Sequence, residues 1–107
     1  MVAVVSDAPI TGDKDVAHAG LVGPNSVIQL AHALRELAGE GAAREVFAQA
    51  GLSGLLDRLP DEMVDERLPA RLFAALSRTL PGPTAGVVAI DAGRRTARYI
   101  LKHRIPR

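Results

Sequence analysis

Residues 24–39 decide the fold of this chain, and they read PNSVIQLAHALRELAG. Apolar side chains recur there at three- and four-residue steps, which is the period of an amphipathic helix. These side chains are Val27, Leu30, Ala31, Leu34, Leu37 and Ala38. Ser26 and Gln29 have the spacing of a capping box at a helix start, and Gly39 is a typical helix stop. The pattern predicts a helix that buries one face.

Weaker helical patterns follow this segment toward the C-terminus. We expect a second helix at residues 42–50 and a short helical piece at residues 52–59, which Pro60 stops. A third helix is expected to start near Pro69 and to end before Pro81. Each of these segments is short, so their stability must come from packing against one another.

The last predicted helix starts after Pro83 and ends at about His103. At about 100° per residue, its apolar and charged side chains fall on opposite arcs. The apolar arc comprises Ala89, Ile90, Gly93, Ala97, Ile100 and Leu101. The charged arc comprises Asp91, Arg94, Arg95, Arg98 and Lys102. Val87 and Val88 lie outside the apolar arc, and the pattern as a whole predicts a basic amphipathic helix.

Length and composition indicate one small folded domain. The chain has 107 residues, of which 48% are hydrophobic and 23% charged. We predict a mostly α fold of four or five short helices at residues 23–107, after a flexible N-terminal arm at residues 1–22. The sequence contains no cysteine, which excludes disulfides, thiol catalysis and cysteine-based metal sites.

Positive charge is concentrated at the C-terminus. Residues 1–93 carry 7 Lys or Arg and 12 Asp or Glu, whereas residues 94–107 carry 6 basic residues and no acid. This basic stripe is open to four interpretations: a solvated face, an anionic lipid surface, nucleic acid, or carboxylates on a ligand or partner. We do not expect nucleic acid, because Tyr99 is the only aromatic residue in the stripe and the rest of the chain is acidic.

The N-terminal residues do not resemble a secretory signal, because the apolar run at residues 1–5 is short and no positive charge precedes it. No stretch reaches the ~18 apolar residues of a membrane-spanning helix. We therefore expect a cytoplasmic location, with peripheral contact at a membrane surface as an open alternative.

Common enzyme signatures are absent from the sequence, including the dinucleotide-binding glycine motif, the phosphate loop and the zinc protease motif. No cofactor is evident, so hydride chemistry would have to be supplied from elsewhere. Catalytic residues are unknown at this level.

Two groups of side chains could bind a metal or stay solvated. His32 could be an axial ligand, with Glu36 one helical turn away to hold its second nitrogen. The acidic residues of the run 61–66 could hold Mg²⁺ or act as an acid–base pair. The alternative for the acidic run is a solvated turn that compensates a helix dipole, and we expect no metal site.

Three segments together resemble a known family. They are Gly23-Pro24-Asn25, Met63-Val64-Asp65-Glu66, and Ala92-Gly93-Arg94-Arg95-Thr96-Ala97-Arg98-Tyr99-Ile100-Leu101 followed by His103-Arg104-Ile105-Pro106-Arg107. From about Gly20 to Arg107 the chain resembles the 4-vinyl reductase family of bacteriochlorophyll synthesis, and the last segment is the most specific part. The resemblance implies a Mg-tetrapyrrole intermediate as ligand, and reduction of its vinyl group at C8 to an ethyl group.

The resemblance also implies how much of a domain is present. Family members are longer, and the part that this chain resembles is the N-terminal helical half of an α+β small-ligand-binding domain, whose sheet is missing here. The apolar arc of the last helix would then be partly exposed, and self-association into a homo-oligomer is expected.

These observations lead to one main hypothesis for function. The chain acts in bacteriochlorophyll synthesis, nominally as 4-vinyl reductase of divinyl (proto)chlorophyllide and mechanistically as a factor that binds and delivers a Mg-tetrapyrrole. Arginines would pair with propionates, and Leu34, Phe73 and Ile100 would contact the macrocycle. The candidate binding residues are Arg94, Arg95, Arg98, Tyr99, Lys102 and His32. The alternatives are a non-catalytic helical module that docks on another enzyme of the pathway, and a truncated fragment.

Overall fold

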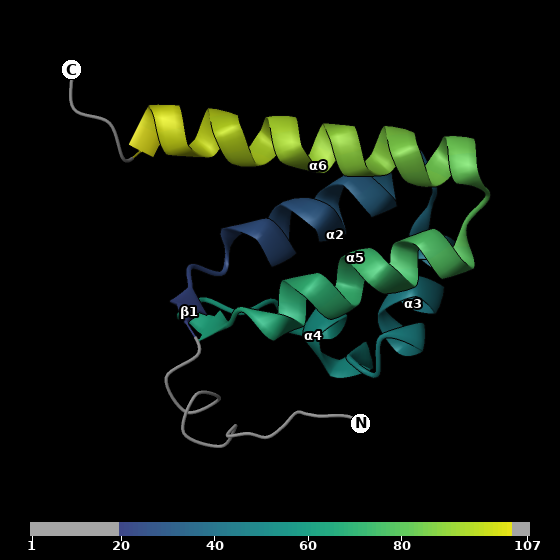
Figure 1. The fold of residues 1–107 in the computed structure, drawn as a ribbon, viewed down its shortest axis with the longest axis horizontal. Helices are drawn as coiled ribbons and strands as arrows, with labels where there is room; N and C mark the ends of the chain where they lie inside the picture. The colour runs from purple at the N-terminus through teal and green to yellow at the C-terminus, as the bar shows by residue number, and fades with distance from the viewer. Residues whose placement is uncertain (1–19, 104–107) are drawn as a thin grey trace, which may run out of the picture.

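The computed structural model describes residues 20–103, which are mostly helical as predicted (Figure 1). The elements are β1 (Leu21–Val22), α2 (Asn25–Leu37), α3 (Glu40–Gln49), α4 (Ser53–Asp57), β2 (Val64–Asp65), α5 (Arg67–Thr79) and α6 (Gly82–His103). A helix is present at each predicted place, with ends that differ from the expected ones by one or more residues. The predicted N-terminal arm lies outside the described residues, except for its last three.

The start of α2 differs from the predicted capping box. The carbonyl oxygen of Pro24 accepts the first backbone hydrogen bonds of the helix, and no side chain caps it. Gln29 Nε2 donates to Asn25 Oδ1 at 3.0 Å instead of reaching back to Ser26. The capping box cannot form because the helix already begins at Asn25, with Pro24 as its N-cap residue, so Ser26 lies inside the first turn. At the other end, the predicted stop is confirmed, because Gly39 has a φ of +95° that favours glycine.

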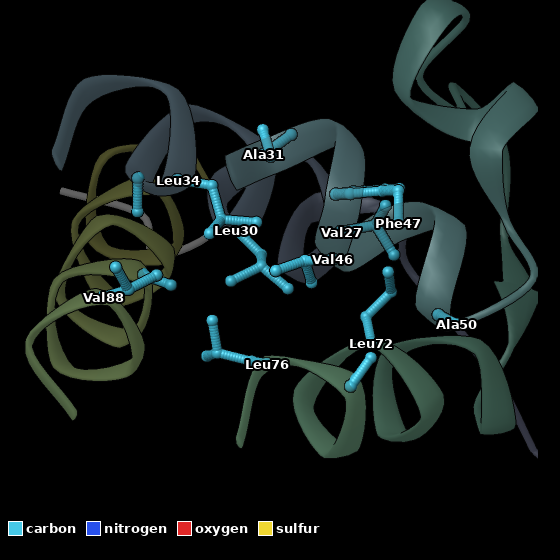
Figure 2. Packing of buried hydrophobic residues seen from close by; sticks show 14 of the residues in the cluster. Val27, Leu30, Ala31, Leu34, Val46, Phe47, Ala50, Leu72, Leu76 and Val88 are labelled. Carbon is cyan, nitrogen blue, oxygen red and sulfur yellow. The ribbon is translucent and has the colours of Figure 1, made fainter. Parts of the chain in front are cut away.

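All the described helices contribute to one hydrophobic core. The largest fully buried side chains are Phe47, Leu30, Leu34, Leu56, Leu72, Leu76, Val27, Val46 and Val88. Figure 2 shows Leu30 of α2, Val46 of α3 and Leu76 of α5 pointing into the same space between the helices. Burying one such side chain contributes about 1.5–3 kcal/mol to folding. The helix α2 supplies five residues to the core and lies between α6 and α5 in Figure 1, so it is the central helix of the fold.

The helix α6 packs mainly on α2 and also touches α5, and its buried residues are Ala85, Val88 and Ala92. Val88 lies outside the apolar arc that the sequence predicts, so the packing face was not foreseen. Small side chains at this face let the two helix axes approach closely. Within residues 20–103, no helix is both long and apolar enough to cross a membrane.

The expectation of a partly exposed apolar arc on α6 is confirmed. Ile90, Ile100 and Leu101 are 60%, 41% and 55% exposed. The helix thus has two apolar faces, and only the one made of alanine and valine is covered by α2.

A two-stranded antiparallel sheet pairs β1, which precedes α2, with β2, which precedes α5. In it β1 and β2 are antiparallel, with Leu21 opposite Asp65 and Val22 opposite Val64. Beside this pair, the backbone N–H of Glu66 donates to the carbonyl oxygen of Gly20 at 3.1 Å. The sequence pattern predicted an arm and a turn here, because two-residue strands are too short to show a strand period.

Candidate functional site

The predicted basic stripe lies along α6, and its members have different surroundings. Arg94, Arg98 and Lys102 are exposed and follow one another at four-residue steps, so they line one flank of the helix. None of these three cations forms an ion pair with any residue between positions 20 and 103. Their charges are available to an anionic ligand or surface.

Arg95 is engaged within the fold. Its Nε donates to Asp91 Oδ2 at 2.6 Å, one turn earlier on α6, and its Nη2 donates to Glu36 Oε1 on α2. The hydrogen bond with Asp91, followed by that with Glu36, raises the pKa of Arg95 above its ordinary value. Arg95 was a candidate binding residue, but in the structure its guanidinium group forms ion pairs with Asp91 of α6 and Glu36 of α2.

A shallow groove lies beside Arg94, between the C-terminal end of α2 and α6. One hollow of about 290 Å³ is lined by Leu37, Val87, Ile90, Asp91 and Arg94. A second hollow of about 290 Å³ shares Leu37 and Val87 and is lined further by Pro83, Thr84 and Val88. We call the two together the Leu37 groove.

The Leu37 groove is lined mostly by apolar side chains, and one end carries Arg94 together with Asp91, whose Oδ2 accepts a hydrogen bond from Arg95. Leu37, Val87 and Ile90 are 46%, 56% and 60% exposed, which is unusual for large apolar side chains so close together. Arg94 lies at the end of the groove nearest the basic flank. Such a surface suits a ligand with a flat apolar body and a carboxylate, because a guanidinium group pairs well with a carboxylate.

The three predicted macrocycle contacts do not form one surface. Leu34 is fully buried in the core and cannot contact a ligand. Phe73 lines a different hollow between α5 and α6, of about 350 Å³, which no charged side chain lines. Ile100 is near the C-terminal end of α6. The interpretation is wrong for Leu34, because periodicity marks apolar faces without showing which of them packing covers. For Phe73 and Ile100 it stays a prediction.

The candidate axial ligand His32 does not reach the Leu37 groove. It is exposed on α2, five positions before Leu37, and at about 100° per residue the two side chains point about 140° apart around the helix. Its expected partner Glu36 accepts a hydrogen bond from Arg95. Leu37 and Arg94 therefore line the same hollow, whereas His32 lies on another side of α2.

Tyr99 lies against the last residue of α6 instead of the groove. Its ring centroid is 4.4 Å from that of His103, and the two planes are tilted by 35°. About 100° of helix rotation separates Tyr99 from Arg98, so the aromatic pair lies on another flank than the arginine.

The acidic run supports the start of α5. Asp65 Oδ1 accepts hydrogen bonds at 2.9 Å from both the backbone N–H and the Nε of Arg67, and Oδ2 accepts one from Nη2. These bonds, with the side-chain ones largest, lower the pKa of Asp65 to about 2. No group of three or more potential metal ligands is found in the described part of the chain. The dipole-compensating interpretation fits this geometry better than a Mg²⁺ site.

Comparison with known proteins places the chain beside a protein of bacteriochlorophyll synthesis. No protein family model matches the chain, and no solved structure matches it. The chain is similar to the bacteriochlorophyll synthase 23 kDa chain of Cereibacter sphaeroides, with 34% identity over 106 residues. The match covers 94% of this chain and 46% of that protein. The chain thus spans about half the length of the relative.

Proposed function

We propose that this chain acts in bacteriochlorophyll synthesis and that it binds a Mg-tetrapyrrole intermediate and delivers it to another enzyme. One observation supports the pathway: the similarity to a bacteriochlorophyll synthase 23 kDa chain. Since the chain corresponds to about half of that relative, its activity and partners are our proposal and not a transfer from the whole protein.

The Leu37 groove is the observation that carries the binding role. A macrocycle would lie on Leu37, Val87 and Ile90, with one propionate at Arg94. Arg98 is one helical turn further along the same flank, about 6 Å up the axis, and is available to a second carboxylate. Exposed ion pairs contribute about 0–1 kcal/mol each, so apolar contact supplies most of the affinity and the arginines mainly set orientation.

The finer function is reduction of the C8-vinyl group to an ethyl group, which requires a hydride and a proton at the vinyl carbons. In our proposal this chain presents the pigment, and a second protein or a reduced cofactor supplies the hydride. Asp91 is the one carboxylate that lines the groove, and its Oδ2 accepts a hydrogen bond from Arg95. We therefore assign Asp91 a structural role and name no proton donor.

An absorption and fluorescence titration tests the binding role. The purified chain is titrated with Mg-protoporphyrin and with divinyl protochlorophyllide, in the absence of reductant. We expect a saturable shift of the pigment bands with a stoichiometry near one pigment per chain. The double substitution Arg94→Ala and Arg98→Ala should weaken binding several-fold, up to about tenfold, because two exposed charge pairs are lost.

A matched control separates pairing from general charge loss. Arg58→Ala removes an exposed arginine from another part of the surface and should leave the affinity unchanged. If Arg58→Ala and Arg94→Ala lowered the pigment affinity equally, the Leu37 groove would no longer be assigned as the pigment site. A folded chain that binds no pigment but co-purifies with another enzyme of the pathway would favour a docking module instead.

A further inference from the structure

The C-terminal end of α6 is exposed on every side. The last buried residue of the helix is Ala92, and each residue from Ala97 to His103 is exposed. Figure 1 shows α6 along one edge of the molecule, with α2 and α5 on its inner side. A short stretch of free helix gains little stability from its own hydrogen bonds, so a binding partner would stabilise it.

The chemistry of this end is apolar on one arc and cationic on the next. Ala97, Ile100 and Leu101 share the apolar arc, and Arg98 and Lys102 lie beside it, one turn apart. We call these five residues the terminal face. Both of its cations are without an ion pair to any residue in the range 20–103, and α6 contains no acid after Asp91.

Charge decides which partner fits the terminal face. A second copy docked through the same face would bring Arg98 and Lys102 of both copies into one interface, and this face has no acid to pair with them. An anionic surface is the complement of this arrangement. Basic amphipathic helices lie in the plane of a bilayer interface, with the apolar arc among the acyl chains and the cations at the phosphates.

We propose that the terminal face docks this protein on the surface of an anionic lipid bilayer. Ile100 and Leu101 insert at the boundary between headgroups and acyl chains, and Arg98 and Lys102 reach the lipid phosphates. This inference goes beyond pigment binding, because no residue of the terminal face lines the Leu37 groove and docking needs no tetrapyrrole. Arg98 alone is shared with the pigment proposal, so the variants below leave it unchanged.

Vesicle sedimentation tests the inference. The pigment-free, full-length chain is mixed with vesicles of phosphatidylcholine alone, or of equal amounts of phosphatidylcholine and phosphatidylglycerol. We expect binding to the anionic vesicles to be at least on the order of tenfold stronger than to the neutral ones, and to weaken in high salt. Binding that is absent, or equal on both vesicles, would overturn the proposal.

Two variants and one control locate the surface. Leu101→Glu and Lys102→Glu should each weaken binding to the anionic vesicles several-fold or more. Met63→Glu is the matched control, because Met63 is 58% exposed in the loop before β2 and Leu101 is 55% exposed on α6. Met63→Glu should lower binding less than Leu101→Glu, and an equal or larger loss from Met63→Glu would contradict the assignment.

The same variants distinguish this inference from its rivals. Leu101→Glu should leave the pigment titration unchanged, so failure of membrane docking and failure of pigment binding are separate results. Sedimentation equilibrium tests for pairing of two copies. A dimer that Leu101→Glu dissociates, together with no binding to vesicles, would overturn lipid docking in favour of self-association. Far-UV circular dichroism checks that each variant is folded.

Discussion

The first part of α6, residues 82–96, and its last part, residues 97–103, both contain alanine, larger apolar side chains and arginine, but they differ in what surrounds them. In the first part, Ala85, Val88 and Ala92 are buried against the rest of the fold, and Arg95 next to them is held by two carboxylates. In the last part, from Ala97 onward, every described residue is exposed. The comparison teaches that the covered face of α6 is its small-residue face, and that the larger apolar side chains remain available for binding.

The largest expected effect comes from two adjacent valines in the first part. Val88 is fully buried and Val87 is 56% exposed. Val88→Asp buries a charge without a partner and should destabilise the fold by about 3 kcal/mol or more. Val87→Asp should change stability by no more than about 0.5 kcal/mol. Urea unfolding, followed by circular dichroism, measures the free energy of unfolding of both variants. If the two variants lost the same amount, the assigned packing face of α6 would be wrong.

A smaller effect tests why alanines form the covered face. Ala92→Leu adds volume where α6 meets its neighbours, so overpacking should cost about 1–3 kcal/mol. Ala97→Leu adds the same volume at an exposed position and should be neutral within about 0.5 kcal/mol. If both variants are equally stable in urea, close approach of the helices is not what selects these alanines.

The arginines give the next comparison. Arg95→Ala removes the ion pairs with Asp91 and Glu36 and should lower the free energy of unfolding by about 0.2–1 kcal/mol, a loss that high salt reduces. Arg94→Ala removes a charge that has no ion-pair partner between residues 20 and 103, so its cost should be close to zero. Thermal melts at low and high salt measure the difference. A larger loss from Arg94→Ala would show that the two arginines have been assigned the wrong roles.

The last prediction concerns pH and the acidic run. The pKa of Asp65 is lowered from 3.8 to about 2, first by the side-chain hydrogen bonds of Arg67 and then by the backbone one. The ionised form is therefore favoured in the folded chain. Its stabilising contribution is present above about pH 4 and is lost as the pH falls toward 2.

The variant Asp65→Asn checks this dependence. It should lower the melting temperature near neutral pH, and its curve should converge with that of the unchanged chain as the pH falls toward 2. If the melting temperatures of the two chains differed by the same amount at all pH values, the charge of Asp65 would not contribute to stability.

Local patterns were enough to predict the helices. The three- and four-residue steps of residues 24–39 predicted α2, and Gly39 marked its end, because both signals depend on near neighbours in the chain. The basic amphipathic character of α6 was readable in the same way. The predicted capping box was wrong because the helix begins two residues earlier than the box requires, so Pro24 and not Ser26 is the N-cap residue.

Contacts between distant residues could not be predicted from these patterns. Arg95 and Glu36 are 59 positions apart, so nothing in the local sequence marks them as partners. The sheet of β1 and β2 likewise joins segments that are distant in the chain. The Leu37 groove forms where the end of α2 meets α6, and its key residue Leu37 was interpreted as part of a buried face.

The central claim is that the Leu37 groove binds a Mg-tetrapyrrole, and nuclear magnetic resonance tests it most directly. The ¹⁵N-labelled chain is titrated with Mg-protoporphyrin, and the backbone amide shifts are followed. Our account predicts saturable shifts centred on Leu37, Val87, Ile90 and Arg94, with little change at Leu56 in the core. Shifts centred on Phe73 in the hollow between α5 and α6, or no saturable shifts at all, would contradict it.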